Sequence, residues 1–214
     1  MLTTTLQTIW NLLPKDENGE ADSGSAQLYW QGLLEALGKT RPDDDPVTLL
    51  WILENCGMKS ALATTDSFPG HSRAIRLYAC RCARYAQPFI EHYSEVKALR
   101  LAIEAAEKLA RGLGNADEMA DAASQIDFDQ PPYYWQDIAI SVTISDDSPD
   151  FAHIVTRIYQ EVIEVVQNLP GRLNPYSLAG DAAEAKCRED LRREFIRLCK
   201  LEGEYGEVDL LDKT

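Results

Sequence analysis

Cys80 and Cys82 stand one residue apart among arginines and tyrosines in YACRCARYA (78–86), and no other stretch looks as much like a chemical site. Zinc sites with short ligand spacing use two to four intervening residues, usually on a turn, and a second pair of ligands elsewhere. In a helix, residues i and i+2 point about 200° apart, so these two thiols cannot converge on one ion. A disulfide between them would require the helix to unfold. The spacing therefore predicts no metal site at these cysteines.

The helix predicted over 73–89 separates cationic from apolar side chains. At 100° per residue, an arc of about 140° holds Arg73, Arg76, Arg81 and Arg84, opposite an apolar stripe that includes Cys82. We therefore expect Cys82 to be buried. Cys80 lies on the arginine side, where it either packs beneath another helix or has its thiol pKa lowered by the cations. In the second case the arginine arc, or Cys80, would hold an anion in a small helical enzyme or binding domain.

Other residue types that often act in catalysis form no recognised pattern here. His71, His92 and His153 do not cluster in the sequence, and no nucleophile-elbow, phosphate-loop or zinc-protease motif occurs. Glu161 and Glu164 share one helix face, as in dimetal carboxylate sites, but the Glu-x-x-His partners that such sites use are absent. We therefore expect a protein that is not an enzyme and that uses neither metal nor cofactor.

The acidic stretch IDFDQPPYYWQDIAISVTISDDSPD (126–150) is the strongest candidate for a binding surface. Nine carboxylates and one aromatic run lie between Asp117 and Asp150. Aromatic side chains supply binding energy, and an excess of one charge speeds the encounter with an oppositely charged protein. We predict that this segment binds a basic protein partner through the following residues: Asp127, Asp129, Tyr133, Tyr134, Trp135, Asp137, Asp146 and Asp147. The alternative is that Tyr134 and Trp135 fill the core while the acids keep the loop soluble.

Almost every segment outside this stretch has the periodicity of a helix. We predict helices at 3–13, 26–37, 47–56, 58–63, 73–89, 95–111, 115–124, 148–169 and 178–202. Residues 138–144 alternate with β-branched side chains, which favours one short extended or β segment there, and the tail 205–214 is expected to be loose. The predicted fold is all-α, an irregular helical bundle or orthogonal helix array, in a single domain spanning 1–214. On the wet face of 95–111, Glu104–Lys108 and Glu107–Arg111 are expected to form i,i+4 ion pairs.

The net charge of this 214-residue chain is −14, which disfavours general binding to nucleic acid or to an anionic membrane. The charge is uneven, because residues 71–112 carry 8 basic and 4 acidic side chains whereas residues 113–170 carry 1 and 11. There is no apolar run long enough to span a bilayer, and we expect no secretory leader. Five cysteines without a disulfide pattern favour the reducing cytoplasm.

Residues 46–123 are similar to part of a known family. The stretches DPVTLLWILENCGMKSALATT, HSRAIRLYACRCARYAQPFIEHY and KALRLAIEAAEKLARGLGNADEMADAAS resemble a bacterial family of immunity proteins of toxin systems. The shared positions are mainly small and apolar helix-packing residues, so the resemblance implies a helical fold and a toxin-type partner. The family provides no catalytic residues to transfer. Beyond this region it continues with Ala-rich helices, whereas this chain inserts the acidic segment 126–150.

These observations predict an acidic, immunity-type protein that binds and neutralises a basic toxin or effector by occlusion. A second interaction hypothesis is that the acidity mimics nucleic acid, as in phage inhibitors of host-defence nucleases. Competition with DNA for the target would separate these two hypotheses. The third hypothesis is the anion-binding or enzymatic use of the arginine arc.

Overall fold

The computed structural model describes residues 2–13, 15, 25–68, 70, 72–89, 96–126, 138, 142–143, 151–167 and 178–200. Its helices are α1 (Leu6–Leu12), α2 (Ser25–Ala36), α3 (Leu49–Ala63), α4 (Ser72–Ala86), α5 (Val96–Ala110), α6 (Ala116–Ser124), α8 (Phe151–Gln167) and α9 (Leu178–Leu198), with short 3-10 helices at Thr65–Ser67 and Gln87–Phe89. Two short strands, β1 (Thr3–Thr5) and β2 (Pro46–Thr48), form an antiparallel sheet. The predicted all-α class is confirmed, as an array of helices with a small β segment.

The β segment lies where the sequence analysis expected helix. Thr4 pairs with Val47 at the centre of the two-stranded ladder, and β-branched residues of this kind favour extended backbone. Helix α3 therefore begins only at Leu49, with the Thr48 hydroxyl accepting a hydrogen bond from the Trp51 backbone N–H at 3.0 Å. Ile138 and Val142 are helical and buried. The predicted strand at 138–144 is therefore wrong for these two residues.

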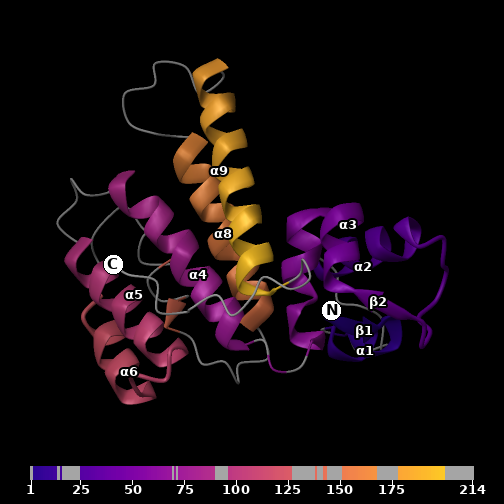
Figure 1. Cartoon of the computed structure of the whole chain (residues 1–214), viewed down its shortest axis with the longest axis horizontal. Helices are drawn as coiled ribbons and strands as arrows, with labels where there is room; N and C mark the ends of the chain where they lie inside the picture. The colour runs from indigo at the N-terminus through magenta and orange to yellow at the C-terminus, as the bar shows by residue number, and fades with distance from the viewer. Residues whose placement is uncertain are drawn as a thin grey trace.

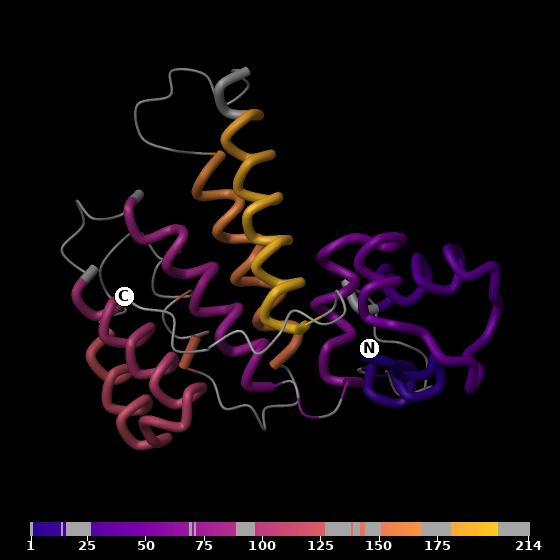
Figure 2. Tube along the Cα trace, in the orientation of Figure 1, coloured from indigo at the N-terminus to yellow at the C-terminus, as the bar shows by residue number. Residues whose placement is uncertain are grey.

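Helix α4 occupies the centre of the array and packs against α5, α8 and α9 (Figure 1). Helices α5 and α6 lie to one side of it, whereas α1, α2, α3 and the two strands lie at the opposite end of the molecule, where α3 packs against α8 (Figure 2). Side chains on α4, including those of Arg76, Arg81 and Arg84, can therefore reach other helices on several sides.

One cluster of buried side chains extends from Leu6 on α1 to Cys199 just after α9. Helix α4 contributes Tyr78, whose ring meets that of Phe195 on α9 edge-on, with centroids 5.2 Å apart. Rings of this size each remove about 150–250 Å² from water, which is worth at most about 4–6 kcal/mol. The contact fixes α9 against α4 at the level of Tyr78.

Helix α3 is bent at Gly57, which has φ 82° and ψ 177°. This left-handed φ strains residues with a Cβ, so glycine suits the position. The break that the sequence analysis expected between 47–56 and 58–63 is confirmed. None of the described helices is long and apolar enough to cross a membrane. The predicted loose tail, 205–214, lies outside the described residues.

Candidate functional site

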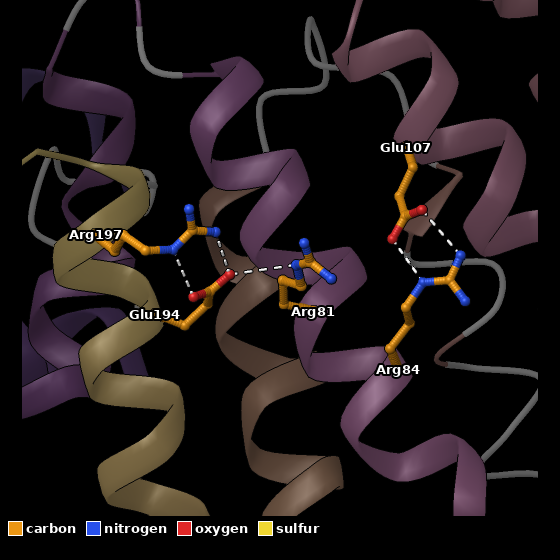
Figure 3. A network of polar contacts seen from close by, with 5 residues as sticks. All are labelled: Arg81, Arg84, Glu107, Glu194 and Arg197. Carbon is orange, nitrogen blue, oxygen red and sulfur yellow. Dashed lines mark hydrogen bonds and ion pairs between the residues drawn. The ribbon is translucent and has the colours of Figure 1, made fainter. Parts of the chain in front are cut away.

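Arg81 and Arg84 hold α4 to its neighbours on two sides (Figure 3). Arg84 donates from Nε and Nη2 to Oε1 and Oε2 of Glu107 on α5, at 2.7 and 2.9 Å. Arg81 pairs through Nε with Oε1 of Glu194 on α9 at 3.3 Å. The same Glu194 carboxylate accepts two hydrogen bonds from Arg197, at 2.9 and 2.7 Å. These contacts form two ionic links, one between α4 and α5 and one between α4 and α9.

Glu107 has a different partner from the one that the sequence analysis expected. Its side chain is buried and turned toward Arg84 instead of forming an i,i+4 pair with Arg111. Burial alone would raise the pKa of Glu107, but the hydrogen bonds and charge of Arg84 outweigh it and lower that pKa. Glu104 and Lys108 form no ion pair with a described residue either. Both predicted i,i+4 pairs on α5 are therefore wrong.

Arg76 is 1% exposed and lies among core residues, not on the wet side of α4. Its Nη1 donates to the backbone carbonyl of Val142 at 2.9 Å and approaches Sδ of Met119 at 3.4 Å. The guanidinium lies over the Phe151 ring, 5.1 Å from its centroid, which is a cation–π distance. Burial lowers the pKa of this guanidinium. Arg76 thus joins α4, α6 and α8 to Val142, a residue of the acidic segment 126–150.

The four arginines therefore do not share one exposed arc. Arg73 alone of the set is exposed, Arg76 is buried, and Arg81 and Arg84 are engaged by carboxylates. An anion on this helix face would have to displace the carboxylates paired with Arg81 and Arg84 and could not reach the buried Arg76. The shared anion site stays a prediction. Helix periodicity could not reveal these contacts, because Val142 and Glu107 are 66 and 23 residues from the arginines that contact them.

Cys80 and Cys82 are both fully buried in the core. The expectation for Cys82 is confirmed, and Cys80 packs beneath a neighbouring element. Desolvation raises the pKa of Cys80 to about 12, and the opposing effect of Arg76, Arg84 and Arg81 is smaller. A thiol with so high a pKa is almost entirely protonated at neutral pH and is a poor nucleophile. The burial of Cys80 and its raised pKa both count against the reactive-thiol alternative, which stays a prediction.

All eight predicted partner-binding residues lie outside the described part of the chain: Asp127, Asp129, Tyr133, Tyr134, Trp135, Asp137, Asp146 and Asp147. Within the same segment, Ile138 and Val142 are buried in the core cluster, at 0% and 1% exposure. The segment is thus attached to the helices at two positions inside it. Neither attachment was expected from the sequence, although the i,i+4 spacing of two apolar residues was a usable signal.

The remaining candidate groups are dispersed. Glu161 pairs with Arg157 at 2.9 Å on α8, and His153 is exposed on the same helix. Within the described residues there is no group of three or more His, Cys, Asp or Glu side chains that could hold a metal ion.

The geometry defines a mostly helical protein in which α4 is ionically linked to α5 and α9. No protein-family model matches the chain, and neither a characterised protein nor a solved structure is significantly similar to it. The resemblance of residues 46–123 to immunity proteins stays a prediction.

Proposed function

We propose that this chain is an acidic, protein-binding inhibitor that neutralises a basic toxin or effector by covering its surface. Residues 127–150 contain six aspartates and no Lys or Arg, together with the run Tyr133-Tyr134-Trp135. Such a segment attracts a cationic protein at long range and offers aromatic side chains for the contact itself. The partner-binding residues proposed are the eight named in the sequence analysis.

The observation that carries this proposal is the attachment of the acidic segment to the helices. Val142 is buried, and its carbonyl accepts a hydrogen bond from the buried guanidinium of Arg76 at 2.9 Å. Ile138 is buried immediately after Asp137, and Val142 lies four residues before Asp146. Attachment close to the charged residues limits the conformational entropy that they lose on binding.

The ion pairs of Arg81 and Arg84 also favour the protein-binding hypothesis over the anion-binding hypothesis. Arg81 and Arg84 are neutralised by Glu194 and Glu107, and Arg76 is out of contact with solvent. An anionic ligand at this face would have to break two ion pairs before it could bind. A partner of the opposite charge, attracted to the acidic segment, requires no such rearrangement.

The proposal is tested by affinity capture from the source cell, followed by titration calorimetry of the purified chain against the captured basic protein. Asp127→Asn, Asp129→Asn and Asp137→Asn together should weaken binding by about 10–100-fold and reduce its salt dependence, because both follow the lost charge. Co-expression with the wild-type chain should relieve the toxicity of that partner, and the triple variant should relieve it less.

The matched control removes three negative charges elsewhere, with Glu35→Gln, Asp44→Asn and Glu54→Gln. These side chains are exposed on or near α2 and α3, in the part of the molecule that lies away from α5 and α6. The control should bind within about twofold of wild type, because distant exposed charges are screened at physiological salt. Equal binding by the two triple variants would refute the acidic segment as the interface. Competition of DNA with this chain for the partner would instead indicate a nucleic-acid mimic.

A further inference from the structure

Helix α5 carries a stripe of cations that form no ion pair with any residue that the structure describes. At 100° per residue, Lys97, Arg100, Glu104, Lys108 and Arg111 fall within an arc of about 80°. Three of the basic residues are exposed and Arg111 is half-buried. Within the described part of the chain, none of the four cations forms an ion pair, since Glu107 is taken by Arg84.

The other long polar helices of the molecule behave differently. On α8 and α9, most cations pair with a carboxylate one turn away, as in Arg157–Glu161, Lys186–Asp190, Arg188–Glu184, Arg193–Glu189 and Arg197–Glu194. Glu104 lies within the same arc, so the stripe on α5 carries four positive charges and one negative charge in a chain whose net charge is −14.

Helix α6, which packs against α5, carries the opposite charge on its outer side. Asp117, Glu118 and Asp121 lie within an arc of about 100°, are exposed, and form no ion pair with a described residue. The two acids in the first turn also stabilise the helix N-terminus. Asp121 lies beyond the first turn and has no such role. The hairpin of α5 and α6 therefore presents a positive and a negative stripe on adjacent helices.

The turn that joins these helices holds an apolar side chain in the solvent. Leu113 is 70% exposed, more than any other large hydrophobic residue in the described part of the chain. Its backbone is fixed, because its N–H bonds the carbonyl of Lys108 at 2.8 Å and Gly112 takes φ 70°. In helix ends of this type, the corresponding residue frequently packs against the last turn. Here it remains available for a contact outside the chain.

We propose that the α5–α6 hairpin is the interface of a homodimer, with the basic stripe of each copy against the acidic stripe of the other. A twofold interface uses the same patch on both subunits and must therefore be self-complementary, which this hairpin is in charge. A twofold axis parallel to the hairpin places each α5 over the partner's α6 and brings the two Leu113 turns to the same end. Both helices lie at the end of the molecule away from α1–α3 (Figure 1), and the charged side chains Lys97, Arg100, Lys108, Asp117, Glu118 and Asp121 are exposed.

The size of the hairpin sets the expected strength of association. A 15-residue helix is about 22 Å long, and two neighbouring helices are about 20 Å wide. Because the 9-residue α6 is only about 14 Å long, the two helices offer a face of about 350 Å². Two copies would bury roughly 700 Å² in total, which is at the low end of weak or transient interfaces. We therefore expect a weak dimer, with a dissociation constant on the order of 10–100 µM, although area alone does not fix affinity. The dimer should weaken with salt, because its main attraction is between exposed charges.

The test is sedimentation equilibrium of the full chain at 10–200 µM in 0.15 M and 0.5 M NaCl, with two charge-reversed variants. One variant carries Lys97→Glu, Arg100→Glu and Lys108→Glu, and the other carries Asp117→Lys, Glu118→Lys and Asp121→Lys. Each variant alone should be monomeric, because like-charged stripes then face each other. Their mixture should form a heterodimer at least as tight as the wild-type dimer, because all stripes are again complementary.

Two further variants separate the interface from general charge effects and from misfolding. Arg41→Glu, Lys59→Glu and Lys200→Glu together make the same charge change elsewhere and should leave dimerisation intact. The Asp117→Lys, Glu118→Lys and Asp121→Lys variant could unfold α6, so a second variant is needed. Leu113→Ser changes no charge and lies in a turn, and it should weaken the dimer about tenfold. A monomeric wild-type chain at 200 µM in 0.15 M NaCl would overturn the proposal. So would a mixture of folded charge-reversed variants that fails to associate, which would point to a different acidic protein as the occupant of α5.

Discussion

The link between Arg84 and Glu107 makes a quantitative prediction about stability. Arg84→Met removes both charge-assisted hydrogen bonds and leaves the Glu107 carboxylate buried without them. Breaking a fully buried pair in this way costs about 3–5 kcal/mol, whereas exposed pairs contribute little. Because the Arg84 side chain is 32% exposed and that of Glu107 is 9% exposed, we expect a loss between these limits, about 2–3 kcal/mol. For a chain of this size that loss lowers Tm by about 4–12 °C.

A double-mutant cycle isolates the interaction from the loss of each side chain. Glu107→Leu combined with Arg84→Met should be within about 1 kcal/mol of wild type, because the pair is replaced by apolar groups of similar volume. The coupling free energy should then be at least about 1 kcal/mol. Urea unfolding followed by circular dichroism at 222 nm measures all four proteins.

The exposed pair Arg193–Glu189 provides the control, because it has a similar distance of 2.9 Å but side chains that are 67% and 49% exposed. Its coupling should be only about 0.3–0.5 kcal/mol. The pKa of Glu107 is lowered below its ordinary 4.5, so its stabilisation is complete above that pH and is lost as pH falls through the folded-state value. The stability gap between wild type and Arg84→Met should accordingly narrow below pH 4.5. Equal coupling in the two pairs would refute the reasoning from burial.

Three other substitutions test separate features. In a Cys56→Ser chain the four remaining cysteines are all buried, so no thiol should react quickly with Ellman's reagent at pH 8. For Cys80, burial also raises the thiol pKa to about 12. A fast phase that is lost on Cys80→Ser would contradict its burial. Arg76→Met should lower stability by about 1.5–3 kcal/mol and speed amide exchange in peptides that contain Val142 more than in those of α2; a uniform change would argue against anchoring. Asn115→Ala should cost about 1 kcal/mol, because the Asn115 side chain caps α6 by accepting from the Glu118 N–H at 2.9 Å, and an unchanged urea midpoint would exclude that role.

The helices could be predicted from the sequence because their signals are local. Apolar residues repeat at three- and four-residue spacing, and Asn115 and Gly57 mark a cap and a bend at the positions the structure shows. The pairing of Thr3–Thr5 with Pro46–Thr48 has no comparable signal, since its partners are about 43 residues apart and only three residues long. The β-branched residues of these strands are compatible with extended backbone, but strands this short form only where a tertiary contact supplies their partner.

The contacts of the arginines and of Glu107 could not be predicted from a helical wheel. A wheel places Arg76 and Arg84 on one arc, but it does not include the carbonyl of Val142 or the carboxylate of Glu107 that reach them from other elements. Long side chains rotate toward such partners over several ångströms, so the nominal angle of a Cβ does not decide burial. Arg111, in contrast, loses the partner that the wheel predicts, because the Glu107 side chain turns toward Arg84 on α4.

The central position of α4 has a consequence for how the molecule opens. A helix that packs on α5, α8 and α9 at once can expose its backbone only when those three helices separate. Its amide protons, around Ala79 and Ala83, should therefore exchange at the rate set by complete unfolding. Among the described elements, α1 packs mainly on β1 and the 3-10 helix Thr65–Ser67, and α2 mainly on α3. These two helices can therefore open by smaller fluctuations and should exchange earlier. Native-state hydrogen exchange should accordingly find the last-opening unit of the protein in the helix that contains its arginine-rich stretch.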